Sequence, residues 1–195
     1  IYKMFQEYSE IEIQKSGWIE IITGSMFSGK TEELIRRIQI SEISEPNVKV
    51  LKPKVDNRYA EDEIVTHSKV SIKCVSVESS SELFRMARNS KIVGIDEAQF
   101  FDEGIIKVCN DLANMGIRVI VAGLDMDFLG NPFGPMPNLM AVAEFVTKVH
   151  AKCSKTGELA NFSHRLNPDG KTIQVGGEAA YEAVSRFIFK EMLNK

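Results

Sequence analysis

The sequence has few of the features that mark secreted and membrane proteins. It contains 3 cysteines, Cys74, Cys109 and Cys153, an odd number without the spacing of a disulfide framework, so we expect free thiols. No apolar run approaches the roughly 20 residues that a membrane-spanning helix needs. Residues 2–14 show no signal-peptide pattern. These absences lead us to expect a cytoplasmic protein without a membrane partner.

An excess of basic residues is also absent. The chain has 24 Lys and Arg residues against 27 Asp and Glu residues, which gives a formal net charge of -3. A nucleic-acid-binding surface is usually marked by clustered positive charge, so nucleic acid is not an expected partner. The sequence does contain 44% apolar residues among its 195 positions. That suffices for a globular core in one full domain with a small additional unit.

The order of the sequence patterns predicts a parallel α/β sheet. Short apolar or alternating runs indicate strands, and helical periodicity indicates helices. Their alternation along a chain is typical of a parallel sheet with helices packed against it. The predicted strands are residues 18–23, 48–53, 70–77, 91–96, 118–124 and 144–153, with a short strand near 64–66, and the predicted helices are residues 29–41, 82–89 and 105–115. Either Ser80 or Ser81 is the predicted cap of the second helix.

The last third of the chain differs from the rest in composition and periodicity. Residues 125–138 are rich in Gly and Pro and predict a loop, and residues 154–179 show little helical periodicity. We therefore predict a second, smaller unit at this end of the chain. Apolar residues near its end predict a closing amphipathic helix, and these are Tyr181, Val184, Phe187, Ile188 and Met192.

A phosphate-binding motif lies between the first predicted strand and the first predicted helix. The segment GSMFSGKT fits G-x-x-x-x-G-K-[ST] in full. Glycines let consecutive backbone N–H groups face inward, and the helix N-terminus favours an anion. The Lys reaches the β- and γ-phosphates, and the Thr hydroxyl binds Mg²⁺. The predicted phosphate site consists of Gly24, Ser25, Met26, Phe27, Ser28, Gly29, Lys30 and Thr31.

Two acidic residues supply the partners that such a loop requires. Asp96 ends the apolar strand of KIVGIDEAQFF, where its carboxylate can bind Mg²⁺ beside Thr31. Glu97 follows it and is the candidate general base. A base that activates water gives an NTPase, whereas a base that activates a hydroxyl group gives a kinase.

The motif DEAQ at residues 96–99 also matches the second motif of helicases, so an ATPase motor is the alternative function. Motors of that kind use two RecA-like domains, and this chain is too short for two. It also lacks the basic strand-binding surface that such a motor needs. The kinase interpretation is therefore better supported.

The chain resembles the type II thymidine kinases, the cellular and bacterial family. The resemblance runs from about residue 17 to 189 and rests on ITGSMFSGKTEELIRR, KPKVDNRY, GIDEAQFF, AGLDMDF and IQVGGEAAY in this order. It implies a RecA-like P-loop domain with a central parallel sheet at residues 17–149. A lasso domain with a closing helix follows at residues 150–195, and residues 1–16 are an N-terminal extension. It further implies a homotetramer that transfers the γ-phosphate of ATP to the 5′-hydroxyl of thymidine, with dTTP as a feedback inhibitor.

The resemblance also assigns roles to individual residues. Lys30 and Thr31 hold the triphosphate and Mg²⁺, Asp96 is the Mg²⁺ carboxylate, and Glu97 is the catalytic base. Further contacts to ATP and its phosphates are assigned to Asp56, Arg58 and Gln99. The nucleoside is expected to contact Met26, Phe100, Leu124, Phe128, Phe133, Ser163, Tyr181 and the segment Thr172, Ile173, Gln174, Val175 and Gly176. Flat aromatic walls suit a base and allow stacking.

One part of the family pattern is missing. The family commonly holds a structural zinc with two C-x-x-C pairs, which fall at positions 153, 156, 185 and 188 of this chain. These positions hold Cys153, Thr156, Ser185 and Ile188, and a structural zinc needs four ligands in a closed tetrahedron. The spacing of His150 and His164 fits no familiar site. We therefore predict that no structural zinc is bound.

Overall fold

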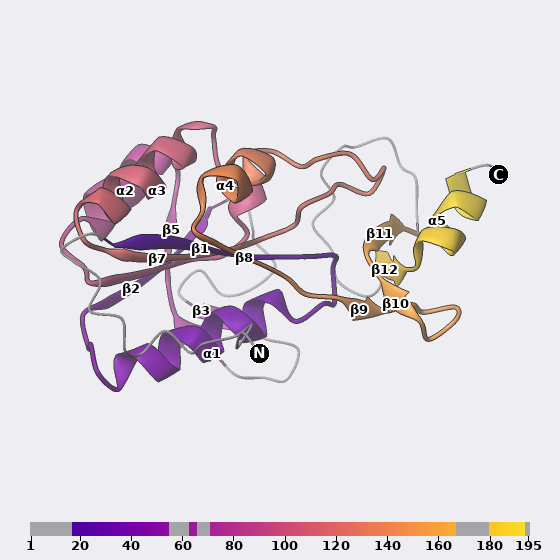
Figure 1. The fold of residues 1–195 in the computed structure, drawn as a ribbon, viewed down its shortest axis with the longest axis horizontal. Coiled ribbons are helices and arrows are strands. Elements are labelled where there is room, and N and C mark those ends of the chain that lie inside the picture. The colour runs from indigo at the N-terminus through magenta and orange to yellow at the C-terminus, as the bar shows by residue number, and fades with distance from the viewer. Residues whose placement is uncertain (1–16, 55–62, 66–70, 167–179, 194–195) are drawn as a thin grey trace, which may run out of the picture.

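The computed structural model describes residues 17–54, 63–65, 71–166 and 180–193 (Figure 1). The predicted N-terminal extension, Asp56, Arg58 and residues 172–176 lie outside these ranges. No helix in the described part of the chain is long and apolar enough to cross a membrane.

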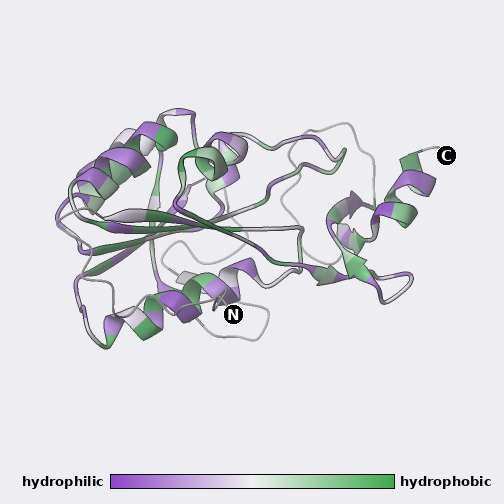
Figure 2. Cartoon of the chain, in the orientation of Figure 1, coloured by the Kyte–Doolittle hydropathy of each residue, from purple (hydrophilic) through white to green (hydrophobic). Residues whose placement is uncertain are grey.

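A six-stranded parallel sheet forms the centre of the molecule, as the sequence predicts. Every pair of neighbouring strands is parallel. In spatial order the strands are β5 (Val75–Val77), β2 (Val48–Pro53), β6 (Ile92–Ile95), β7 (Arg118–Gly123), β1 (Trp18–Thr23) and β8 (Phe145–Lys148). Figure 2 shows that much of this sheet is coloured as hydrophobic, which is typical of parallel strands covered on both faces.

Helices cover both faces of the sheet (Figure 1). Helix α1 (Lys30–Glu42) packs Leu34, Ile35 and Ile38 on one face, against Ile22 and other strand residues. The opposite face carries α2 (Ser80–Ala87), α3 (Gly104–Asn114) and α4 (Met136–Val142), whose apolar residues share a core cluster with β1, β6 and β7. The sheet is therefore the middle of three layers.

Small antiparallel sheets follow the central one. Strand β9 (Ala151–Lys152) pairs with β10 (Leu159–Ala160), and β11 (Phe162–Arg165) pairs with β12 (Tyr181–Val184). Helix α5 (Arg186–Leu193) closes the described chain. These elements have a core cluster of their own, which includes Phe162 stacked on Phe189 with ring centroids 4.4 Å apart. Earlier in the chain, β3 (Glu63–Val65) pairs with β4 (Ser71–Lys73).

Two predicted strands are each divided in the structure. The run 70–77 forms β4 and β5, which flank Cys74 and pair with different partners, β3 and β2. The run 144–153 forms β8 in the central sheet and β9 outside it. Alternating hydrophobicity predicts an extended chain, but it does not say which strand becomes the partner.

Two predictions about helices were wrong in detail. The cap of α2 is Ser79, whose side chain accepts a hydrogen bond from the Glu82 backbone N–H, instead of Ser80 or Ser81. The closing helix begins at Arg186, because Tyr181–Val184 forms β12 against β11. Apolar residues at positions 181, 184 and 188 fit a helical period by coincidence, since the first two belong to a strand.

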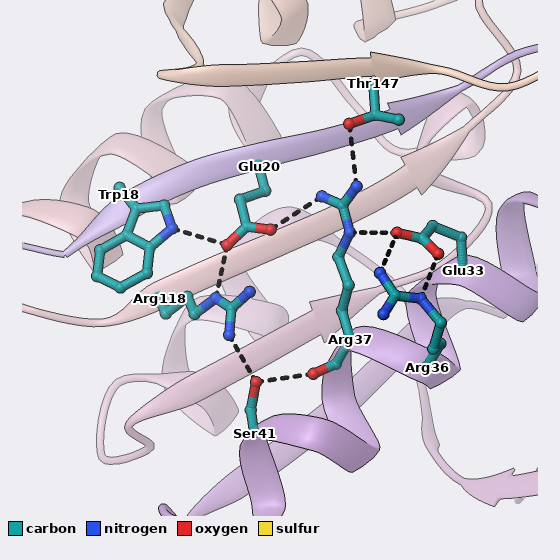
Figure 3. A network of polar contacts seen from close by, with 8 residues as sticks. All are labelled: Trp18, Glu20, Glu33, Arg36, Arg37, Ser41, Arg118 and Thr147. Carbon is teal, nitrogen blue, oxygen red and sulfur yellow. Dashed lines mark hydrogen bonds and ion pairs between the residues drawn. The ribbon is translucent and has the colours of Figure 1, made fainter. Parts of the chain in front are cut away.

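A buried polar network ties α1 to the sheet (Figure 3). Glu20 is only 6% exposed, and its carboxylate accepts hydrogen bonds from Trp18, Arg37 and Arg118 at 2.7, 2.9 and 2.5 Å. Arg37 extends the network to Glu33 and to Thr147 of β8. The pattern WIEIIT thus places one charged residue inside an apolar strand, where two arginines neutralise it.

Candidate active site

The phosphate-loop motif joins the end of β1 to the start of α1, as its context requires. Gly24 has a φ of 147°, and a Cβ atom there would lie 2.2 Å from the Val149 carbonyl oxygen. Gly29 has a φ of 84° and is the residue before the first turn of α1. Both positions therefore favour glycine because of their positive φ, and Gly24 does so also because the backbone of Val149 lies so close.

The side chains of the loop fit a bound phosphate. Lys30 Nζ donates a hydrogen bond to the Ser25 carbonyl oxygen at 2.8 Å, which folds the ammonium group back over the loop. The hydroxyl oxygens of Ser25 and Ser28 are buried and have no hydrogen-bond partner in the described part of the chain. Buried hydroxyl groups normally have partners, and phosphate oxygens would supply them.

Asp96 lies beside the loop at the end of β6. Its Oδ2 accepts a hydrogen bond from the Thr31 hydroxyl at 3.2 Å, and its Oδ1 accepts one from the Glu97 backbone N–H at 2.9 Å. Burial and the adjacent Glu97 carboxylate raise the pKa of Asp96 to about 7. The hydroxyl and the carboxylate are the hard oxygen ligands that Mg²⁺ prefers, and such a cation favours the ionised carboxylate. Thr31 and Asp96 thus fit a Mg²⁺ site.

Glu97 is held in position by Gln99. Gln99 is 3% exposed; its Nε2 donates to Glu97 Oε2 at 2.5 Å, and its Oε1 accepts from the Leu124 backbone N–H at 2.9 Å. The short helix η1 (Ala98–Phe100) carries Gln99 and begins directly after Glu97. Gln99 was expected to contact ATP; in the structure its side chain contacts the candidate base and the backbone of Leu124 after β7.

Candidate nucleoside residues come from separate segments and meet in pairs. Phe100 and Phe133 pack edge to face with ring centroids 5.7 Å apart. The Met26 backbone N–H donates to Ser163 Oγ at 2.9 Å, which joins the phosphate loop to β11. Tyr181 is paired with a residue that the sequence did not mark, since its hydroxyl accepts a hydrogen bond from Arg165 at 3.1 Å.

The same Arg165 lies over the ring of Phe128, with its guanidinium carbon 4.0 Å from the centroid. Sequence reasoning missed this residue because a single Arg in FSHR belongs to no motif. Its burial is the only signal that distinguishes it, and burial is a property of the tertiary structure.

The residues at the family's zinc positions form a different arrangement. Cys153 is buried, and burial by itself raises the pKa of its thiol. Hydrogen bonds from the Thr156 hydroxyl and from the backbone N–H groups of Ser185, Lys155 and Thr156 outweigh this effect and lower the pKa to about 7. Ile188 packs with the C-terminal cluster and offers no ligand atom. One thiol and two hydroxyls do not fit a closed zinc site.

Comparisons with known proteins identify the family of the chain. The family model described as Thymidine kinase matches residues 17–189. A thymidine kinase of Bacteroides thetaiotaomicron is 51% identical over 183 residues, 94% of this chain and 92% of the relative. One from Bacteroides fragilis is 49% identical over 98% of this chain and 96% of the relative, and one from a Rhodothermus species is 48% identical over 89% and 82%.

Among solved structures, the Pif1 helicase from Candida albicans is similar at 15% identity and a TM-score of 0.44, over 68% of this chain and 36% of that one. A similarity this low has no bearing on function. The sequence relatives are matched over nearly their whole length, and the family model spans the central sheet and the C-terminal strands alike. The chain belongs to the thymidine kinase family.

Proposed function

We propose that the protein is an ATP-dependent thymidine kinase, which transfers the γ-phosphate of ATP to the 5′-hydroxyl of thymidine and forms dTMP for nucleotide salvage. One observation carries this proposal. A half-buried carboxylate, Glu97, is held by Gln99 next to the Thr31–Asp96 pair at the end of the phosphate loop. Proton acceptor and phosphate holder thus lie at one edge of the sheet.

The donor side is built by the loop. Backbone N–H groups of residues 24–31 and the Lys30 ammonium hold the phosphates, and the helix N-terminus of α1 adds a favourable dipole. Thr31 and Asp96 are the residues that would hold Mg²⁺, which when bound neutralises charge on the transferred phosphoryl group. Asp56 and Arg58 are proposed as further phosphate contacts and lie outside the described residues.

The acceptor side is built around Glu97. In the proposed mechanism its carboxylate accepts the proton of the 5′-hydroxyl as the hydroxyl oxygen bonds to the γ-phosphorus and the bond to the β-phosphate oxygen breaks. General-base catalysis of this kind is typically worth about 10²–10⁴-fold in rate. The hydrogen bond from Gln99 to Glu97 supports this role, because it restricts the orientation of the carboxylate.

The base is proposed to bind between apolar side chains. Met26, Phe100, Leu124, Phe128 and Phe133 are half-buried, which leaves part of each surface for a ligand. Ser163, Tyr181 and the backbone of residues 172–176 are proposed to complete this side, the last of these outside the described residues. From the family resemblance we further propose feedback inhibition by dTTP, a homotetramer, and a cytoplasmic location.

Thymidine-dependent release of ADP tests this function. The purified full chain is incubated with ATP and Mg²⁺, first alone and then with each deoxynucleoside or with single-stranded DNA. We expect ADP release to depend on thymidine and to match dTMP formation mole for mole. ADP release that responds to DNA and ignores thymidine would support the ATPase motor instead.

A further inference from the structure

Arg165 is a buried cation between two candidate nucleoside residues. It lies on β11 and is 6% exposed. Its guanidinium carbon is 4.0 Å from the centroid of the Phe128 ring and 5.7 Å from that of Tyr181. Its Nη2 also donates to the Tyr181 hydroxyl at 3.1 Å. Arg165 therefore contacts both aromatic rings.

The two rings are far apart in the sequence, and Arg165 contacts both of them. Phe128 belongs to the turn-rich segment 125–138, whereas Tyr181 lies directly opposite Arg165 in the β11–β12 register. A guanidinium group stacks on aromatic faces and donates hydrogen bonds in its own plane. One Arg side chain can thus fix the face of Phe128 and the hydroxyl of Tyr181 at the same time, which a Lys cannot do equally well.

The alternation of β11 supports a role at the site. Side chains two residues apart on a strand share a face, so Ser163 and Arg165 share one face of β11. Ser163 contacts the phosphate loop through Met26. The alternate residues of β11 point elsewhere, since Phe162 stacks on Phe189 of the C-terminal cluster and His164 contacts Glu182. The Arg165 face of β11 is the face turned towards the proposed site.

We infer that Arg165 is a positioning residue that holds Phe128 and Tyr181 at the base-binding side and thereby determines thymidine affinity. This inference rests on the proposed function. A buried charge is costly unless its contacts compensate, and the contacts with Phe128 and Tyr181 contribute to that compensation. The contacts of Arg165 to Phe128 and Tyr181 both lie on the proposed nucleoside side.

Arg165→Met tests the inference, because Met retains apolar volume but removes the charge and the hydrogen-bond donor. Loss of the cation–π contact and of the hydrogen bond predicts a KM for thymidine roughly 10-fold higher. The KM for ATP should stay unchanged. Arg165→Lys should show a smaller increase, since the charge remains over Phe128.

Arg186→Met is the matched control. Arg186 also lies over an aromatic ring, Phe162, at 4.9 Å, but it is exposed and belongs to α5 away from the candidate site. We expect this variant to keep both KM values. Thermal unfolding of all variants, and titration calorimetry with thymidine, separate a loss of binding from a loss of folded protein.

Tyr181→Phe provides a second test that does not depend on the stability of Arg165→Met. It removes only the hydroxyl that accepts the hydrogen bond from Arg165, so it should by itself raise the KM for thymidine. Where Arg165→Met folds, the effect of Tyr181→Phe should largely disappear in that background. An unchanged KM for thymidine in Arg165→Met, or equal increases for thymidine and ATP, would overturn the inference. If Arg165→Met does not fold, full thymidine affinity in both Arg165→Lys and Tyr181→Phe overturns it. A wild-type protein without thymidine-dependent turnover would instead refute the proposed function.

Discussion

Glu97 and Phe27 are the two non-glycine residues with positive φ in the described part of the chain, at 52° and 61°. Both lie in the candidate active site, one as the proposed base and the other within the phosphate loop. A non-glycine residue in this conformation costs about 1–3 kcal/mol and persists where surrounding contacts hold it. At Glu97 those contacts include Gln99, which joins the carboxylate to the strand end at Leu124.

Glu97 is the proposed catalytic base, and its substitution tests that role. We expect Glu97→Gln to lower kcat by about 10²–10⁴-fold, because the amide cannot accept the proton of the hydroxyl group. The KM for ATP should change little, since Lys30, Thr31 and Asp96 remain. Steady-state kinetics with coupled ADP detection measures both quantities.

Glu103→Gln is the control for this variant, because Glu103 is an exposed carboxylate nearby in the chain. It should retain wild-type kcat and KM. Full turnover by Glu97→Gln would remove Glu97 from the proposed mechanism and leave the identity of the base open among the remaining site residues.

At the scale of elements, Glu20 connects β1 to α1 and β7. Burial alone raises its pKa, but hydrogen bonds and charges from Arg118, Trp18 and Arg37 lower the pKa overall below its ordinary value of 4.5. Since the folded-state pKa is the lower one, the unfolded chain takes up the proton first as the pH falls. The stabilisation is therefore complete above about pH 4.5 and is lost as the pH falls through the folded-state pKa.

Glu20→Gln should therefore destabilise the fold in a pH-dependent manner. At neutral pH we expect a loss of about 2–3 kcal/mol in the free energy of unfolding, because two half-buried arginines lose their buried charged partner, and partial exposure reduces the cost below that of a fully buried pair. The difference from wild type should shrink below pH 4.5. Denaturant titrations at pH 7 and at acidic pH measure it.

Glu42→Gln serves as the comparison, because Glu42 is an exposed carboxylate at the end of α1, the helix that Arg37 joins to Glu20. It should cost no more than about 0.5 kcal/mol at either pH, as expected for surface substitutions. A difference between Glu20→Gln and wild type that stays constant with pH would mean that the loss arises from packing, and not from the charge of Glu20.

At the scale of the whole molecule, the C-terminal strands and α5 are held by apolar and polar contacts. Their apolar cluster includes Phe162, Phe189, Val184 and Ile188. The Glu182 carboxylate accepts a hydrogen bond from the Ser154 hydroxyl and forms an ion pair with Lys155. The family's zinc positions lie within this same region. We therefore expect these contacts, without a metal, to hold the C-terminal part of the chain.

Chelator treatment tests this expectation. Incubation with EDTA should leave the melting temperature of the ligand-free protein unchanged, because we expect no structural zinc for the chelator to remove. Removal of such a zinc would be easy to detect, since a structural zinc site contributes roughly 10–16 kcal/mol where it exists. The same treatment should abolish kinase activity, which added Mg²⁺ alone should restore. Metal analysis that finds one tightly bound zinc per chain, or a melting temperature lowered by EDTA, would contradict the prediction.

The central parallel sheet, the strand and helix around the phosphate loop, and the acidic pair after β6 were all predictable from the sequence. Each of these features is encoded in a short stretch of sequence. The segment GSMFSGKT contains the glycines and the lysine that the phosphate loop needs, and the segment WIEIIT contains residues that favour a strand. The sequence could not predict that 70–77 divides between two sheets, because strand pairing is decided by partners distant in the chain. The start of α5 at Arg186 was missed for the same reason, since β11 makes Tyr181–Val184 a strand.

By itself, then, the sequence determined the order of elements, the phosphate loop and the family resemblance, because these depend on short segments read in order. Only the tertiary structure decided which side chains meet. It placed Ser163 on the Met26 backbone, Gln99 on Glu97, and Arg165 between Phe128 and Tyr181. Such contacts join residues up to 137 positions apart, and their existence follows from how the sheets pack, a property that no local pattern records.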